Sequence, residues 1–207
     1  MSSASTNYAK ESAKGVEKLT LEEVLYSSRE IFLTEEVNSD TSAQLIKELM
    51  VLDKLSDEEV TIYINSPGGE VVSGMAVYDV ISMMRAPVRT VCIGTAASMG
   101  AMLFLAGDKR EMLPHTRLMI HDPAFGGGNM AGKKPHELQQ YVDKLKQTQD
   151  IIVDIIAEKT GKSKEEVGET TKEDAYFNVS EAMEYGLATG TYNKLNNTLG
   201  NENLVLI

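Results

Sequence analysis

Ser98 is the residue of this 207-residue chain whose surroundings best suit a nucleophile. It lies in the apolar stretch 95–105, where the pattern predicts that a strand ends and a helix begins. Unpaired N–H groups and the dipole at a helix start stabilise negative charge that develops beside them. The small residues Ala96, Ala97 and Gly100 leave room for another chain to approach the Ser98 oxygen. The alternative is an ordinary N-cap, and on this motif alone the cap is favoured because caps far outnumber nucleophiles.

A glycine-rich turn, Pro67-Gly68-Gly69, follows a second predicted strand and precedes a second predicted helix. Glycine adopts backbone angles that other residues avoid and lets another backbone come close, so the turn suits an oxyanion or peptide site. A plain strand-to-helix connection is an equally good interpretation. The lysine and hydroxyl residues of a phosphate-binding loop are missing, so an ATP-driven step must come from another polypeptide.

His121 is the histidine best placed to be a general base. It ends the apolar stretch 117–121 at the sheet edge where the other two motifs are expected, whereas His115 lies in a turn and His136 begins a helix. A lone histidine at a strand end is more often a surface or hydrogen-bonded core residue. Asp122 is interpreted as a solvated neighbour, and with 31 acidic residues in the chain, spacing alone does not identify the third member of a triad.

The composition excludes several classes of function. A net charge of -11 without clustered Lys and Arg disfavours nucleic acid and anionic membranes as partners. The single cysteine, Cys92, lies in an apolar run and is predicted to be a buried hydrophobic residue, as are most methionines. Three histidines in different elements predict no metal site. Residues 1–18 resemble neither a signal peptide nor an anchor, so we expect a cytoplasmic protein.

The pattern along the chain alternates between strands and helices. Strands are expected over 30–33, 60–64, 88–93 and 117–121, and helices over 20–25, 41–55, 70–84, 98–107, 136–160, from 163 onward, and 180–185. Capping boxes are expected at Thr41 with Gln44 and at Ser163 with Glu166, and residues 170–178 are expected to be irregular. Such alternation predicts an α/β fold with a mostly parallel sheet, whose sites form at the carboxyl ends of the strands.

One domain over 20–192 is expected, preceded by a polar segment over 1–19 and followed by an Asn-rich tail over 193–207. The last four residues of that tail are apolar and could dock on a neighbour.

Taken together, the motifs resemble the proteolytic subunit of the Clp protease, in the right order from about Ile31 to Ala188. The stretches that carry the resemblance are 62–69, 94–101, 113–114, 119–123 and 181–187. The resemblance implies an α/β, crotonase-like fold of stacked βαβ units with a protruding long handle helix. It also implies a serine endopeptidase, which reverses the preference for an N-cap at Ser98.

Matched position by position, the resemblance makes Ser98 the nucleophile, His121 the general base and Asp174 the acid that orients the histidine. Gly69 and Met99 match the backbone donors of the oxyanion hole. The segments that would flank an extended peptide are 70–73 and 125–129, and the substrate-binding residues within and beside them are Gly68, Gly69, Val71 and Phe125. An extended peptide would be held by strand addition, so side-chain selectivity should be modest.

The resemblance further implies assembly with copies of the same chain, as heptameric rings that stack into a tetradecamer around a chamber. A separate AAA+ Clp ATPase would use ATP to feed unfolded polypeptides into that chamber, so no cofactor is expected in this chain. Nucleic acid and membranes are not expected partners.

Three stretches depart from the family pattern. Residues 1–18 have no clear counterpart of the segment that lines the axial pore. Asp122 stands where the family usually has glutamine, and a carboxylate there is expected to perturb the imidazole of His121. Lys172-Glu173 replaces the usual acid-then-arginine pair, and the region after Pro123 differs too, which suggests altered ring pairing, with a paralogue as a partner.

Two other functions remain open at this point. One is a weakly active structural ring subunit that assembles with an active paralogue; the complete Ser98, His121 and Asp174 set argues against it. The other is a crotonase-fold enzyme that acts on acyl-CoA thioesters, which the contexts of Ser98 and His121 disfavour.

Overall fold

A parallel sheet forms the centre of the protein in the computed structural model, which describes residues 7–12, 15–126, 132–194 and 204–206. Its main path runs in the order β3 (Glu30–Leu33), β4 (Val60–Ser66), β5 (Val88–Ala97), β6 (Lys109–Met112), β9 (Gly190–Thr191). β7 (Arg117–Ile120) and β8 (Ala175–Phe177) complete the seven strands; every pairing is parallel except that of β7 with β8. The predicted α/β class is confirmed.

β5 pairs with β4 along one edge and with two strands in succession along the other, which explains why it is longer than the expected 88–93. Its first half, Arg89 to Cys92, pairs with β6, and its last residues, Thr95 to Ala97, pair with β7. Both β6 and the short β8 were missing from the sequence-based expectation; residues 175–177 are a strand, not irregular. β8 is a strand because it pairs with β7, a contact between residues far apart in the chain.

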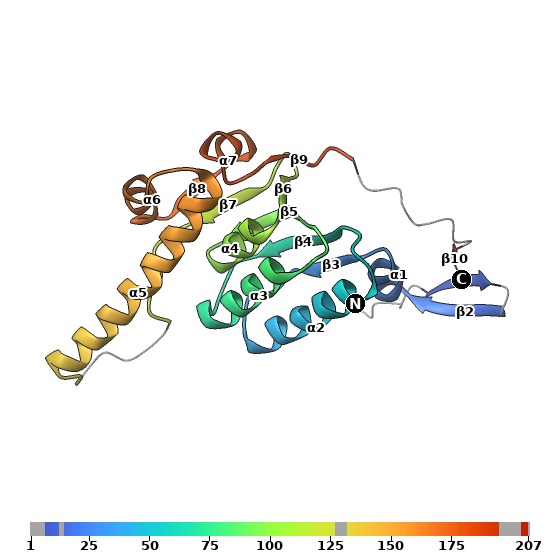
Figure 1. Ribbon diagram of the computed structural model, residues 1–207, viewed down its shortest axis with the longest axis horizontal. Coiled ribbons are helices and arrows are strands. Elements are labelled where there is room, and N and C mark those ends of the chain that lie inside the picture. The colour runs from blue at the N-terminus through green and yellow to red at the C-terminus, as the bar shows by residue number, and fades with distance from the viewer. Residues whose placement is uncertain (1–6, 13–14, 127–131, 195–203, 207) are drawn as a thin grey trace, which may run out of the picture.

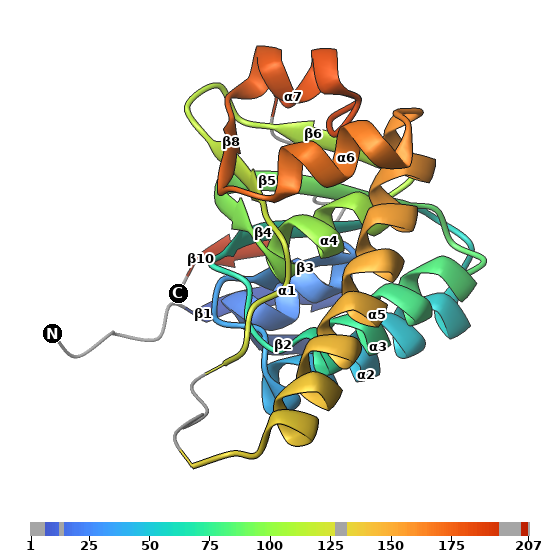
Figure 2. The ribbon, with the colours of Figure 1, turned by 90° about the vertical axis from the view of Figure 1, so that its left-hand side faces the viewer.

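Helices α2 (Ser39–Leu55), α3 (Val71–Met83) and α4 (Met99–Ala106) pack along the sheet, and α1 (Leu21–Ser27) precedes β3 (Figure 1). The long α5 (Pro135–Thr160) projects away from the sheet at one end, and α6 (Lys164–Thr171) and α7 (Val179–Tyr185) follow it (Figures 1 and 2). The protruding helix predicted over 136–160 is therefore present.

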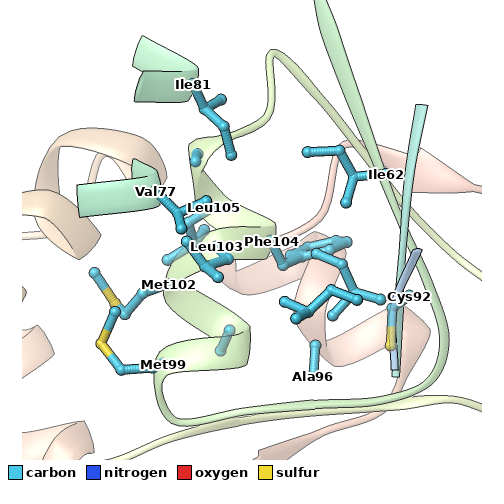
Figure 3. Close-up of a cluster of buried hydrophobic side chains, with 14 of the residues drawn as sticks. Ile62, Val77, Ile81, Cys92, Ala96, Met99, Met102, Leu103, Phe104 and Leu105 are labelled. Carbon is cyan, nitrogen blue, oxygen red and sulfur yellow. The ribbon is translucent and has the colours of Figure 1, made fainter. Parts of the chain in front are cut away.

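α4 is the centre of the hydrophobic core, and all eight of its residues are buried. Its side chains meet Ile62 and Cys92 from the strands and Val77 from α3 (Figure 3). Burying each large apolar side chain contributes roughly 1.5–3 kcal/mol, so this packing fixes the turn that precedes α4. The buried position predicted for Cys92 is confirmed, and burial raises the pKa of its thiol. Of the methionines expected in the core, Met83 is instead 83% exposed.

Helix caps differ from the expected pairs. α2 begins at an Asn38 cap, whose side chain accepts from the N–H groups of Asp40 and Thr41, so the box expected at Thr41 with Gln44 is wrong. Thr41, the third residue of the helix, completes the box because its hydroxyl accepts from the Asn38 N–H. At α6 only half of the expected box is found: Ser163 accepts from the Glu166 N–H, while the Glu166 carboxylate pairs with Lys162.

The polar N-terminal segment contains a hairpin of β1 (Asn7–Ser12) and β2 (Gly15–Thr20). β10 (Leu204–Leu206) pairs antiparallel with β1, so the apolar C-terminal residues dock on the chain's own N-terminal strand. In Figure 1 this small sheet lies at the opposite end of the molecule from α5. Most of the Asn-rich tail, residues 195–203, lies outside the described residues.

Candidate active site

Ser98 sits at the tip of the turn between β5 and α4, with φ 52° and ψ -122°. Its side chain makes no cap hydrogen bond to the helix, so the cap interpretation is wrong. A positive φ is unfavourable for a residue with a Cβ, and the surroundings hold it: the Ser98 N–H donates to Met119 O of β7 at 2.9 Å. The hydroxyl is left to face His121.

His121 links the other two members of the expected triad. Its Nε2 lies 2.9 Å from Ser98 Oγ, and its Nδ1 lies 3.1 Å from Asp174 Oδ1. A carboxylate only accepts, so Nδ1–H donates to Asp174 and Nε2 accepts a hydrogen bond from the Ser98 hydroxyl. The side chain of His121 is 28% exposed and that of Asp174 is 57% exposed.

The pairing of β7 with β8 brings His121 and Asp174 together. His121 directly follows β7, Asp174 directly precedes β8, and the antiparallel register sets Ile120 opposite Ala175. Two residues that are 53 positions apart in sequence therefore leave adjacent strand ends side by side.

Asp122 is not the solvated neighbour that the sequence suggested. It is partly buried, and both of its oxygens accept hydrogen bonds, from Thr171 Oγ1 at 2.5 Å and Gln149 Nε2 at 2.6 Å. The carboxylate is thus engaged by α6 and α5, although it neighbours His121 in sequence.

The Gly68-Gly69 turn lies against Ser98 and requires glycine at both positions. Gly68 has φ +92°, and an added Cβ would lie 2.5 Å from Ala97 O and 2.8 Å from Met99 N. Gly69 has φ +147°, and an added Cβ would lie 2.1 Å from Val37 O. The turn is held by Val37, whose N–H donates to Gly68 O at 2.8 Å and whose carbonyl accepts from the Glu70 N–H at 2.7 Å.

Within the described part of the chain, the N–H groups of Gly69 and Met99 donate to no protein acceptor. Met99 is the first residue of α4, where N–H groups have no partner inside the helix. The added-Cβ distance from Gly68 to Met99 N places the turn next to this donor. An N–H group without a protein acceptor can stabilise a negative charge that develops beside it.

A small apolar hollow of about 20 Å³ adjoins Ser98 and His121. Its other lining residues are Val71, Met99, Met102, Ile120, Pro123, Ile152 and Ile156. Phe125 does not line it; its ring packs edge-on against Tyr141 of α5, with centroids 5.6 Å apart. A groove of about 540 Å³ between α1, β3 and α2 is far larger but contains no member of the Ser98, His121 and Asp174 set.

The sequence did not single out every residue that builds this site; Ile152, Ile156, Asn65 and Ser66 are four of those it left out. Ile152 and Ile156 of α5 line the hollow, and their helical spacing shows only that they share a face. Asn65 Oδ1 accepts from the Thr95 N–H at 3.0 Å, and Ser66 Oγ accepts from the Gly68 N–H at 3.2 Å. The polar Asn-Ser pair at the end of a buried strand was the available signal for the last two.

Among the described residues, no set of three or more His, Cys, Asp and Glu side chains is arranged to hold a metal ion. No helix among them has the length and apolar character needed to cross a membrane.

Comparisons with known proteins identify the family of this chain. A family model described as Clp protease matches residues 13–194. The ATP-dependent Clp protease proteolytic subunit 1 of Prochlorococcus marinus (strain NATL2A) is 35% identical over 187 residues, which cover 89% of this chain and 93% of that protein. The mixed α/β fold with its parallel sheet is consistent with the family, and the matched range contains every candidate site residue named above. This chain belongs to the Clp protease family.

Proposed function

We propose that this protein is the serine endopeptidase subunit of a Clp protease and cleaves unfolded polypeptides. The observation that carries the proposal is the continuous chain of hydrogen bonds from Ser98 Oγ through His121 to Asp174, beside two free N–H donors. Membership of the Clp protease family supports peptidase activity.

In this proposal, His121 Nε2 accepts the Ser98 proton as Oγ attacks the carbonyl carbon of the scissile bond. The N–H groups of Gly69 and Met99 stabilise the oxyanion of the tetrahedral intermediate. His121 then gives the proton to the leaving amine, and the acyl group stays on Ser98. Water, activated by the same imidazole, releases the acyl group and restores the hydroxyl. Asp174 holds the imidazole in the required tautomer throughout.

The substrate in this proposal is an extended peptide lying along Gly68 and Val71 on one side and the segment of Phe125 on the other, held by main-chain hydrogen bonds. The hollow beside Ser98 is apolar and small, which favours a small or medium apolar residue before the scissile bond. Met99 and Met102 are the adaptable part of its wall, whereas Ile152 and Ile156 are stiff.

The family implies oligomeric assembly with Clp ATPases. Our finer proposal is a pair of stacked heptameric rings of this chain in the cytoplasm, with ATP consumed only by the AAA+ partner. Large exposed apolar side chains support association: Leu55 is 70%, Val72 78% and Met83 83% exposed. A ring shared with a paralogue is the alternative arrangement, and the native mass of the purified chain alone distinguishes the two.

The test compares the purified chain with Ser98→Ala, using a fluorophosphonate probe and a short fluorogenic peptide. We expect labelling and cleavage that vanish in Ser98→Ala and in His121→Ala. His115→Ala is the matched control, because His115 is exposed in a turn away from these bonds, and it should retain both activities. Equal signals from the wild-type chain and Ser98→Ala would reject the proposal.

The weakly active structural subunit is not favoured, because His121 lies within hydrogen-bond distance of both Ser98 and Asp174. The acyl-CoA enzyme is not favoured either, because the chain matches the Clp protease family over most of its length.

A further inference from the structure

Asp122 makes three hydrogen bonds to elements that surround the site. Its N–H donates to Thr171 O at 2.7 Å, and its Oδ1 accepts from Thr171 Oγ1 at 2.5 Å. Its Oδ2 accepts from Gln149 Nε2 at 2.6 Å. One residue therefore ties the end of β7 to the last residue of α6 and to the middle of α5.

Thr171 is well suited to be the fixed partner in this tie. Its relative exposure is 0%, and it lies three positions before Asp174. The segment that carries Asp174 is thus connected at two points to the segment that carries His121. Asp122 with Thr171 forms one joint, and the β-pairing of Ile120 with Ala175 forms the other.

The His121–Asp174 bond lies between these two joints. Asp174 is itself 57% exposed, so packing around its own side chain does little to hold it. Its distance from His121 Nδ1 depends on how the two backbones are held. Figure 2 shows α6 beside the end of α5, the helix that supplies Gln149.

We propose that Asp122 is a positioning residue that sets the His121–Asp174 geometry through Thr171 and Gln149. This inference rests on the proposed peptidase function. Aspartate suits the place because two acceptor oxygens on a short side chain meet two donors from different helices. Asparagine would keep both bonds if the Gln149 amide turned over, whereas alanine would leave the buried Thr171 hydroxyl without its main acceptor.

The first experiment measures kcat and KM for the fluorogenic peptide on the assembled protein. For Asp122→Ala we expect kcat to fall about tenfold or more with KM within about twofold, because a small displacement of a catalytic pair lowers the rate more than binding. Asp122→Asn should stay within about threefold of wild type. Thr171→Val should resemble Asp122→Ala, and the double variant should be no worse than either single variant.

Asp143→Ala is the matched control, since Asp143 is an exposed carboxylate that also accepts from a glutamine of α5, Gln139 Nε2 at 2.8 Å. It should leave kcat unchanged. A kcat for Asp122→Ala equal to that of Asp143→Ala would overturn the inference, as would equal losses in the asparagine and alanine variants.

A second measurement does not depend on activity. Hydrogen exchange of the β8 amides, read by mass spectrometry, should be several-fold faster in Asp122→Ala than in the wild type or Asp143→Ala, because this variant loses both side-chain bonds of Asp122 and keeps only its backbone bond to Thr171 O. Unchanged exchange would overturn the inference even in an inactive preparation. Absence of cleavage by the wild-type chain would instead reject the proposed function, so the two failures are distinguishable.

Discussion

Two residues other than glycine have a positive φ in the described part of the chain, and their side chains have different kinds of partner. Arg29, with φ 61°, donates from its guanidinium to the carbonyl oxygens of Leu52, Ser56 and Glu58. Ser98, with φ 52°, offers its hydroxyl to His121 Nε2 alone. Backbone strain is thus stored both at a structural joint and at a candidate active site, and the partner of the side chain tells the two apart.

The largest effect expected from this difference is on activity. Ser98→Ala should lower peptide cleavage by about 10⁴-fold or more, since the nucleophile is removed, while unfolding in denaturant changes little. Steady-state kinetics and equilibrium unfolding on the same preparations measure both quantities. A large loss of stability in Ser98→Ala would break the contrast with Arg29.

The reverse pattern is expected at Arg29. Arg29→Ala should lower the free energy of unfolding by about 3 kcal/mol, because three carbonyl oxygens at and beyond the end of α2 lose a charged donor. The kcat of the protein that remains folded and assembled should be unchanged. Chemical denaturation and active-site titration with the fluorophosphonate probe provide the two numbers; a lower kcat per labelled site would contradict the prediction.

The same contrast separates what the sequence could predict from what it could not. Ser98, His121 and the Gly68-Gly69 turn were predictable as one site, because each follows a strand of an alternating pattern and strand ends of a parallel sheet share an edge. Arg29 gave no signal, since its acceptors are carbonyl oxygens that lie 23 to 29 residues away.

Asp174 shows a second limit. The residues alone did not single it out among 31 acidic residues; it was identified only through the resemblance to a family. Its place beside His121 comes from the antiparallel pairing of β7 with β8, and a three-residue strand carries almost no local pattern. The hollow beside Ser98 depends likewise on α5, whose docking against α4 is a tertiary contact.

Glycine substitutions sharpen the comparison by removing the strain and the side chain together. The free energy of unfolding of Ser98→Gly should be higher than that of Ser98→Ala by about 1 kcal/mol, because glycine adopts a positive φ without the Cβ penalty. The free energy of unfolding of Arg29→Gly should be higher than that of Arg29→Ala by a similar amount, although both Arg29 variants remain less stable than wild type. Equal midpoints for the glycine and alanine variants at either position would show that no strain is stored there.

The smallest expected effect concerns Asp53, which lies near the end of α2 beside the carbonyl oxygens that Arg29 contacts. The pKa of the Asp53 carboxyl is lowered, first by the hydrogen bond from the Ala86 N–H and then by the N–H and guanidinium of Arg85. A carboxyl with a lowered folded-state pKa stabilises the fold above its unfolded pKa of about 4, and this contribution is lost as the pH falls through the folded pKa.

Asp53→Ala should therefore be slightly less stable than wild type at pH 7, with a difference that shrinks below about pH 4. The Arg29→Ala deficit should persist there, because a guanidinium stays protonated over this range. Thermal unfolding of both variants from pH 7 to pH 3 measures this, and a deficit in Asp53→Ala that is independent of pH would assign its role to packing instead of charge.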